Sequence, residues 1–178
     1  MEMPLKPNFE SLTSNKSRFE RFGYFKYQIL AGGDIIIQGN WIKNNICKLP
    51  IPLDPLKVKN FPKDKLVYFH KLVIPSLLYM FEEWERNDLL KYIITWEGSF
   101  YPRLVRGGTS LSNHAFGSAF DINAKWNGYG NEPCKNIFGT VIPLVEIANK
   151  HGWFWGGHYL KKKDGMHFEK VFFNDIGV

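Results

Sequence analysis

Large apolar side chains recur every three or four residues over residues 65–92, with charged residues between them, and this period predicts an amphipathic helix. The repeating positions are Leu66, Phe69, Val73, Leu77, Met80, Phe81 and Trp84. Pro75 lies inside this stretch and is expected to kink or split the helix. A second helix is predicted to begin at Thr140, which can cap it, and to reach about His151, with Gly152 as its stop.

Short β-prone runs bounded by turn residues indicate strands elsewhere in the chain. Residues 25–30 and 34–38 flank Gly32-Gly33 and are expected to form a hairpin. The other predicted strands are residues 41–51, 92–96, 119–123, 154–155 and 166–173. A loop rich in Gly and Ser is predicted over residues 107–113. Together these elements predict an α+β fold in which a small antiparallel sheet is flanked by helices.

Composition fits a single globular domain. The chain has 178 residues, of which 44% are hydrophobic and 22% charged, and this balance excludes a disordered chain. Residues 1–20 are polar and lack periodicity, so we expect a poorly ordered N-terminal arm. No repeat or linker divides the remainder, and residues 21–178 are therefore expected to be one domain that begins with a β-rich extension.

Charge and hydropathy narrow the partners and the location. The formal net charge of +6 favours an anionic partner, and nucleic acid, anionic lipid and bacterial cell wall all meet that condition. The longest apolar stretch, residues 72–81, is too short to span a bilayer, and the start of the chain lacks the apolar segment of a secretory signal. We therefore expect a protein made in the cytoplasm and not inserted in a membrane. Cys47 and Cys134 form no CxxC motif, which excludes a zinc ribbon and leaves a disulfide between them open.

Two histidines have neighbours that suggest metal chemistry. A catalytic zinc ion needs three His or carboxylate ligands, an open position for water and a nearby base. His114 and Asp121 are seven residues apart, and a turn at Gly117 can bring both to one side of the chain. His167 would supply the third ligand from a distant segment, and Asp164 could stand just outside the ligands and accept a proton from water. By spacing alone, each of these histidines is more often a structural residue than a ligand.

The motifs around these residues raise the specificity. The pattern S-x-H-x-x-G-x-A-x-D begins at Ser112, and D-x-M-H-F-E begins at Asp164. Together they resemble the signature of the zinc D-Ala-D-Ala carboxypeptidase family, peptidase family M15. That family includes VanY- and VanX-type enzymes and the L-alanyl-D-glutamate peptidases of phage endolysins. The resemblance extends to residues 100–107 and 152–157, and it is greatest to a branch with a long N-terminal extension, so that it covers nearly all of residues 20–170. It implies a Hedgehog/DD-peptidase-like fold with the zinc site on the sheet.

The resemblance also implies roles for individual residues. It makes His114, Asp121 and His167 the ligands of one zinc ion per chain. It makes Asp164 the catalytic carboxylate, which would take a proton from the attacking water and give it to the leaving amine. Glu169 is expected either to support a zinc ligand or to be an exposed carboxylate on a strand.

Residues that contact substrate are less sharply defined. The family has an arginine upstream of the first motif that binds substrate and stabilises the oxyanion, and Arg103 and Arg106 compete for that role. We favour Arg103, because it follows a segment that resembles the family's Tyr-Arg. Ser112 would bind substrate or orient a ligand, and a loop-capping role explains it equally well. His158 is a candidate for substrate contact, and so is Trp155, which is expected in the core and the cleft wall.

The other histidines are expected to be structural. His70 lies on the predicted helix, and the helix dipole explains His151 at the end of the second one. The basic run at residues 161–163 is expected to be a solvated turn, which could also attract an anionic wall polymer.

The resemblance implies a zinc metallopeptidase that hydrolyses peptidoglycan stem peptides, as an L-Ala-D-Glu endopeptidase or as a D-Ala-D-Ala carboxypeptidase. We expect a monomeric phage or prophage lytic enzyme that reaches bacterial peptidoglycan after holin-type release or phage delivery. The alternative is a non-catalytic, zinc-stabilised module that binds cell wall or belongs to a phage structure. A metal-dependent nuclease is disfavoured, since the sequence has neither a His-Asn-His finger nor a carboxylate cluster for magnesium, and no nucleic-acid partner is expected.

Overall fold

A four-stranded antiparallel sheet forms the centre of the fold in the computed structural model, which describes residues 1–173. Its spatial order is β5-β6-β8-β7. The strands are β5 (Trp96–Gly98), β6 (Ala119–Ile122), β7 (Trp153–Trp155) and β8 (His167–Lys170). In the two central strands Phe120 pairs with Phe168 and Asp121 pairs with His167. Because side chains alternate between the faces of a strand, aromatic rings gather on one face and polar groups on the other.

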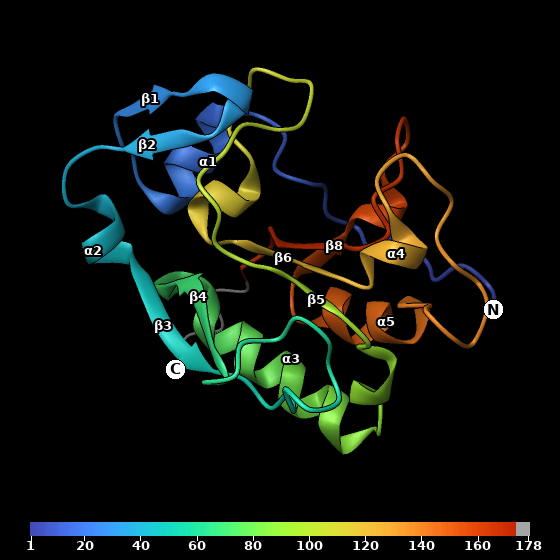
Figure 1. The fold of residues 1–178 in the computed structure, drawn as a ribbon. Coiled ribbons are helices and arrows are strands. Elements are labelled where there is room, and N and C mark those ends of the chain that lie inside the picture. The colour runs from blue at the N-terminus through green and yellow to red at the C-terminus, as the bar shows by residue number, and fades with distance from the viewer. Residues whose placement is uncertain (174–178) are drawn as a thin grey trace.

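Two helices cover the aromatic face of the sheet, α3 (Ile74–Arg86) and α5 (Ile142–Lys150), and both lie below it in Figure 1. Trp84 of α3 contacts the rings of Phe120 and Phe168 edge-on and donates a hydrogen bond from its indole nitrogen to the carbonyl of Leu144 in α5. All these side chains are fully buried. Replacing a phenylalanine in such a core by alanine costs about 3–5 kcal/mol, so this layer holds the sheet in place from behind.

The N-terminal half adds two smaller antiparallel sheets beside the first. The order is α1 (Asn15–Phe22), β1 (Tyr27–Ile29), β2 (Ile35–Ile37), α2 (Trp41–Asn45), β3 (Ile46–Pro50) and β4 (Leu66–His70), with β1 paired to β2 and β3 to β4. Short helices complete the chain: α4 (Ala124–Asn127) and the 3₁₀ turns Ala31–Gly33, Lys71–Val73, Leu90–Tyr92, Asn113–Phe116 and Gly156–His158. Phe25, Trp41 and Phe116 pack together and join this half to the turn that leads into β6.

Several predicted elements are confirmed. The fold is of the α+β class, with small antiparallel sheets and a few helices; the likeness to a DD-peptidase fold stays a prediction. The hairpin around Gly32-Gly33 forms as β1 and β2. The strand predicted over residues 119–123 forms as β6. The side chain of Thr140 accepts the N–H of Ile142 at the start of α5, and Gly152 follows that helix with φ of +75°.

The helix predicted over residues 65–92 is wrong at both ends. Residues 66–70 form strand β4, where Val67 and Phe69 are buried and the side chain between them is exposed, and this alternation has the period of a strand. His70 therefore ends a strand and does not lie on a helix. Pro75 stands in the first turn of α3, where its missing N–H has no helical partner to lose, and it starts the helix without a kink.

Other boundaries also move. The first five residues of the strand predicted over 41–51 form helix α2, and the strand predicted over 92–96 begins only at Trp96. Within the arm predicted over residues 1–20, Asn15 onward forms α1, and Arg18 on that helix is buried. Cys47 and Cys134 are both free thiols. Among the described residues we find no helix with the length and apolar character to cross a membrane.

Candidate metal centre

Three elements bring two histidines and one aspartate together. His114 lies in the 3₁₀ turn Asn113–Phe116, Asp121 on β6 and His167 at the start of β8. Gly117 turns the chain between the first two, with φ of +64°, in the left-handed region that favours glycine. A Cβ there would lie 2.8 Å from both the backbone nitrogen of His70 and the side chain of Ile46. The turn predicted at this glycine is thus confirmed, and no other residue fits it.

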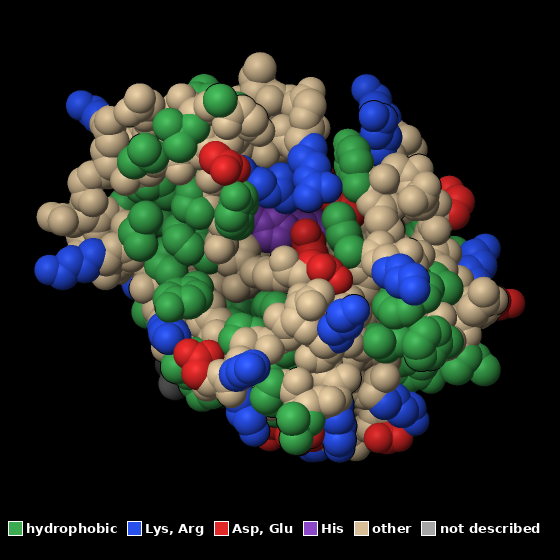
Figure 2. All heavy atoms as spheres, in the orientation of Figure 1, with side chains coloured by type: hydrophobic (Ala, Val, Ile, Leu, Met, Phe, Trp, Pro, Cys, Tyr) green, Lys and Arg blue, Asp and Glu red, His purple; other side chains and the backbone are tan. Residues whose placement is uncertain are grey.

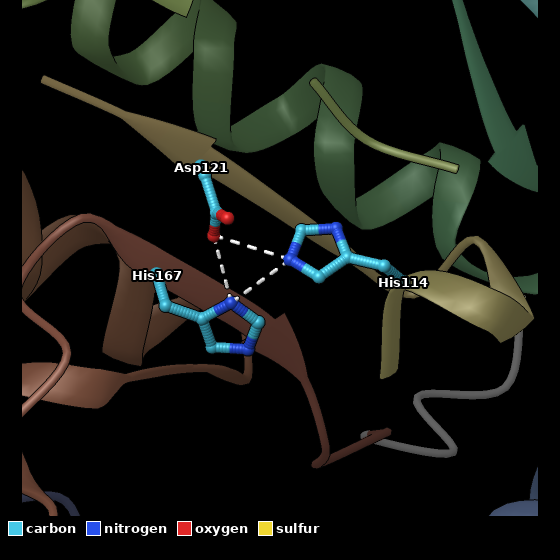
Figure 3. A group of neighbouring side chains, drawn as sticks. All are labelled: His114, Asp121 and His167. Atoms are coloured by element: carbon cyan, nitrogen blue, oxygen red, sulfur yellow. Dashed lines mark hydrogen bonds and ion pairs between the residues drawn. The ribbon is translucent and has the colours of Figure 1, made fainter. Parts of the chain in front are cut away.

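The donor atoms of the three side chains converge on one point (Figure 3). His114 Nε2 lies 3.2 Å from both Asp121 Oδ1 and His167 Nδ1, and His167 Nδ1 lies 2.8 Å from Asp121 Oδ1. All three residues are buried. Ligands about 2 Å from a tetrahedral zinc ion are about 3.3 Å from one another, so the spacing fits zinc closely. Two imidazoles and one carboxylate are also a donor set that zinc accepts.

Each imidazole also has a neighbour on its other side, away from the cluster. His114 Nδ1 is 2.7 Å from the carbonyl oxygen of Ser99, which can only accept, so Nδ1 donates there and Nε2 points into the cluster. His167 turns Nδ1 toward the cluster, and its Nε2 lies 3.9 Å from Glu169. Glu169 is fully buried and accepts hydrogen bonds from the Asn113 side-chain amide and the Tyr159 hydroxyl. The predicted alternative of an exposed strand carboxylate is wrong, because Glu169 is fully buried, and support of a zinc ligand stays a prediction.

The charges of the cluster reinforce one another. Burial alone would raise the pKa of Asp121, but His114 and His167 hold it well below its usual range. For His167, burial acts to lower the pKa, but Asp121 and Glu169 outweigh this effect and raise the pKa to about 10. A metal ion binds the deprotonated imidazole, so its arrival would displace the proton of this pair and keep the carboxylate charged.

Asp164 brings a second carboxylate near the three converging side chains. Its backbone carbonyl accepts the N–H of His167 at 3.0 Å, and its own N–H donates to the carbonyl of Gly156 at 3.0 Å. Gly156 can have no side chain, because a Cβ there would lie 2.4 Å from the Asp164 carbonyl oxygen. Oδ1 of Asp164 is buried without a hydrogen-bond partner among the described residues, and burial raises the pKa of this group to about 6. A carboxyl group that titrates near neutral pH suits proton transfer.

The cluster lies at the bottom of a cavity of about 490 Å³. In Figure 2 the histidine surface is recessed at the centre of the molecule, beside a group of Lys and Arg side chains. The lining includes the predicted residues Arg103, Arg106, Ser112, His114, Asp164 and His167. It also includes residues that the sequence did not single out: Ser11, Thr13, Arg18, Asn113, Tyr129, Tyr159 and Met166, with Lys161 and Lys162 at the basic run.

The two candidate arginines differ in their surroundings. Arg103 is half-buried, and burial lowers its pKa, while Asp121 and Asp164 act on it in the opposite direction. Its Nη1 donates to the carbonyl of Leu104 at 3.2 Å. Arg106 lines the cavity too but is exposed. Arg103 is therefore the arginine whose charge faces the carboxylates of the site.

The three residues predicted to contact substrate also differ in whether they line the cavity. Ser112 lines the cavity, and its hydroxyl accepts the N–H of His114 at 3.3 Å, so it caps the turn that carries a ligand. Trp155 is fully buried and donates to the carbonyl of Gly165 at 2.8 Å. His158 is buried against the Trp155 ring, and burial lowers its pKa to about 4. Among residues 1–173, the cavity lining includes neither Trp155 nor His158, and substrate contact stays a prediction for both.

Comparison with known proteins agrees with the motifs. Residues 106–170 match the family described as D-alanyl-D-alanine carboxypeptidase. This segment contains all three converging side chains and Asp164, whereas Arg103 lies just before it. No curated protein and no solved structure matches the chain. The match agrees with the resemblance to peptidase family M15 that the motifs predicted, and it supports a peptidase.

Proposed function

We propose that this chain is a zinc-dependent peptidase that hydrolyses the stem peptides of bacterial peptidoglycan. One observation carries the proposal: three zinc-type donor atoms converge within 3.2 Å of one another, beside Asp164, whose buried Oδ1 has no partner among the described residues. The family match over the same residues supports a peptidase.

His114, Asp121 and His167 would hold the zinc ion. When bound there, zinc supplies Lewis-acid chemistry that polarises a carbonyl group and makes water more acidic. The Ser99 carbonyl orients His114, and Glu169 lies 3.9 Å from the outer nitrogen of His167, so each ring already turns a nitrogen toward the other two ligands.

Asp164 would move the proton. In its ionised form it accepts a proton from water as the water oxygen attacks the carbonyl carbon of the peptide bond. It then donates that proton to the amide nitrogen as the C–N bond breaks, which releases a carboxylic acid and an amine. Its pKa of about 6 lets it both accept and return a proton near neutral pH.

Arg103 would stabilise the negative charge that develops on the carbonyl oxygen. Its half-buried position and its interaction with Asp121 and Asp164 bring a positive charge to the reacting region. The loss of one such donor typically costs about 3 kcal/mol of transition-state stabilisation. Arg106, Lys161 and Lys162 make the rest of the cavity rim positive, which suits an anionic peptide.

The proposed peptidase cuts either the L-Ala-D-Glu bond or the terminal D-Ala-D-Ala bond of the stem peptide. Its proposed biological role is in phage or prophage lysis. The test is incubation of zinc-loaded protein with purified peptidoglycan, followed by mass spectrometry of the released fragments. New N-terminal D-Glu ends would identify an endopeptidase, and free D-Ala would identify a carboxypeptidase.

Asp164→Asn is the matched control, since it keeps the shape of the side chain and all three ligands. We expect it to retain one zinc ion per chain and to lose about 10²- to 10⁴-fold in rate. A chelated sample of the unaltered protein should be inactive. Intact stem peptides after incubation with fully zinc-loaded protein would contradict the proposal and support the non-catalytic, wall-binding module.

A further inference from the structure

A third arginine reaches the cavity from the N-terminal helix. Arg18 on α1 lines the cavity although only 4% of its surface is exposed. Its Nε donates to the side-chain oxygen of Asn113 at 2.5 Å. Its Nη1 is buried and has no hydrogen-bond partner in the part of the chain that the structure describes. The guanidinium is thus anchored through Nε, while Nη1 keeps an unused donor in a side chain that lines the cavity.

The charge of Arg18 is also uncompensated at close range. Within residues 1–173, no carboxylate of the protein forms an ion pair with it. Glu169 is the nearest influence, but that carboxylate accepts from Asn113 and Tyr159 and faces His167. An arginine stays charged even when buried, and a buried charge without a partner is unfavourable. An anion entering the cavity would remove that penalty.

We propose that Arg18 binds a carboxylate of the substrate, which makes the N-terminal helix part of the recognition site. The proposal rests on the proposed function in one respect, that the ligand is a peptide, and it defines the class as peptides with a free carboxylate. The planar guanidinium can pair with both oxygens of a carboxylate, which favours this anion over a neutral amide. Ser11 and Thr13, from the segment just before α1, line the same cavity.

Arg18 and Arg103 would bind different groups. Arg103 interacts with Asp121 and Asp164, so its charge belongs to the reacting end of the cavity. Arg18 is connected instead through Asn113 to Glu169, on the far side of His167 from the converging atoms. A stem peptide carries more than one carboxylate, so one can bind at Arg18 while the scissile bond lies at the metal centre.

The test is calorimetric binding of L-Ala-D-Glu-L-Lys-D-Ala-D-Ala and of derivatives in which each carboxylate is converted in turn to a carboxamide. All proteins carry Asp164→Asn, so that binding is measured without hydrolysis. We expect one amidation to weaken binding about 10- to 100-fold, the value of a charge-assisted hydrogen bond pair. Arg18→Gln should weaken binding of the free peptide by the same factor and leave binding of that amide unchanged. Arg21→Gln, on the exposed side of the same helix, is the matched control and should bind both peptides as the parent does.

Equal losses for the acid and the amide, or no loss, would overturn the proposal. If Arg18→Gln fails to fold, the side-chain Nε resonance of Arg18 in the otherwise unaltered chain provides the answer. It should shift on titration with the free peptide and stay in place with the amide, and a resonance that ignores both would reject the proposal. Because neither measurement needs hydrolysis, a carboxylate preference that depends on Arg18 can stand even if peptidoglycan is not cleaved.

Discussion

Two buried regions on either side of Gly117 use histidine in opposite ways. In the N-terminal half, His70 packs against Phe22 and Trp41, and both its ring nitrogens are bonded to backbone: Nε2–H to the carbonyl of Phe22, and Nδ1 to the N–H of Leu72. At the metal centre, His114 is tied to the backbone through Nδ1 alone, and its other nitrogen faces two further donor atoms. All these histidines are buried, so burial does not separate the two kinds. The second ring nitrogen separates them, because it is bonded to backbone in His70 and faces the other two ligands in His114.

The largest expected effect comes from breaking this contrast at the metal centre. His114→Ala should abolish zinc binding, from one ion per chain to none, since two remaining donors cannot hold the ion with comparable affinity. His70→Gln should keep one zinc ion per folded chain, because neither nitrogen of His70 faces the cluster. Metal content measured by mass spectrometry after gel filtration checks both. Zinc retained by the first variant, or lost by a folded sample of the second, would contradict the distinction.

Arg103 and Arg106 offer a second contrast, between a half-buried and an exposed side chain of the same type. Arg103→Ala should reduce kcat/KM about 10²- to 10³-fold, because it removes a half-buried charge beside the reacting groups. Arg106→Ala removes an exposed charge that solvent screens, and a loss of less than about 10-fold is expected. Steady-state kinetics on a soluble stem peptide compare the two. A larger loss for Arg106 would exchange their roles.

The support behind the ligands should have a smaller effect. Glu169→Gln keeps the size of the side chain but removes the charge that faces Nε2 of His167. Zinc affinity should fall about 10- to 100-fold, the usual consequence of losing such a partner. Competition with a chromophoric chelator measures it, with the exposed Glu97 and its Gln variant as a control outside this network. An unchanged affinity would show that Asn113 and Tyr159 are sufficient to place the ligand.

The smallest effect concerns stability and belongs to the N-terminal region. Burial lowers the pKa of His70 to about 4 in the folded protein, against about 6.5 when unfolded. The unfolded state therefore binds more protons between these values, so the stability that this group contributes is complete above pH 6.5 and is lost as the pH falls toward 4. When the pH falls from 7 to 4.5, the free energy of unfolding should decrease by about 1–2 kcal/mol less in His70→Gln than in the parent. Urea unfolding at the two pH values measures this, and parallel losses would refute it.

One part of the metal centre has a local signal in the sequence, whereas His167 and the ligand roles were predicted from the resemblance of the two motifs to a known family. The seven-residue span from His114 to Asp121 contains its own turn, and the glycine that makes it is visible in the sequence. The network of Arg18, Asn113 and Glu169 could not be predicted, because its members are 95 and 56 positions apart and each alone is an ordinary polar residue. Only the folded chain shows that they are buried together.

The errors in the fold have a similar cause. Leu66, Phe69 and Val73 have helical spacing, but Val67 and Phe69 also have the alternation of a strand, and local sequence does not decide between them. Pairing with β3 decides, since Cys47 lies opposite Phe69 and Leu49 opposite Val67. Pro75 then stands at a helix start and not within a helix, which changes its effect from a kink to a boundary.

Gly117 limits how far the metal centre can be moved out of its own protein. The turn at this residue is pressed against β3 and β4, and its carbonyl accepts the N–H of His70 at 2.9 Å. Those strands precede the segment that matches the family, as does the Ser99 carbonyl that orients His114. Residues 106–170 are therefore not sufficient to form the metal centre in another protein. They would carry the three ligands without the strands β3 and β4 and the Ser99 carbonyl that position them. Substitutions at Ile46 and at Gly117 should depend on each other for the same reason, because a larger residue at either position needs the space that the other residue borders.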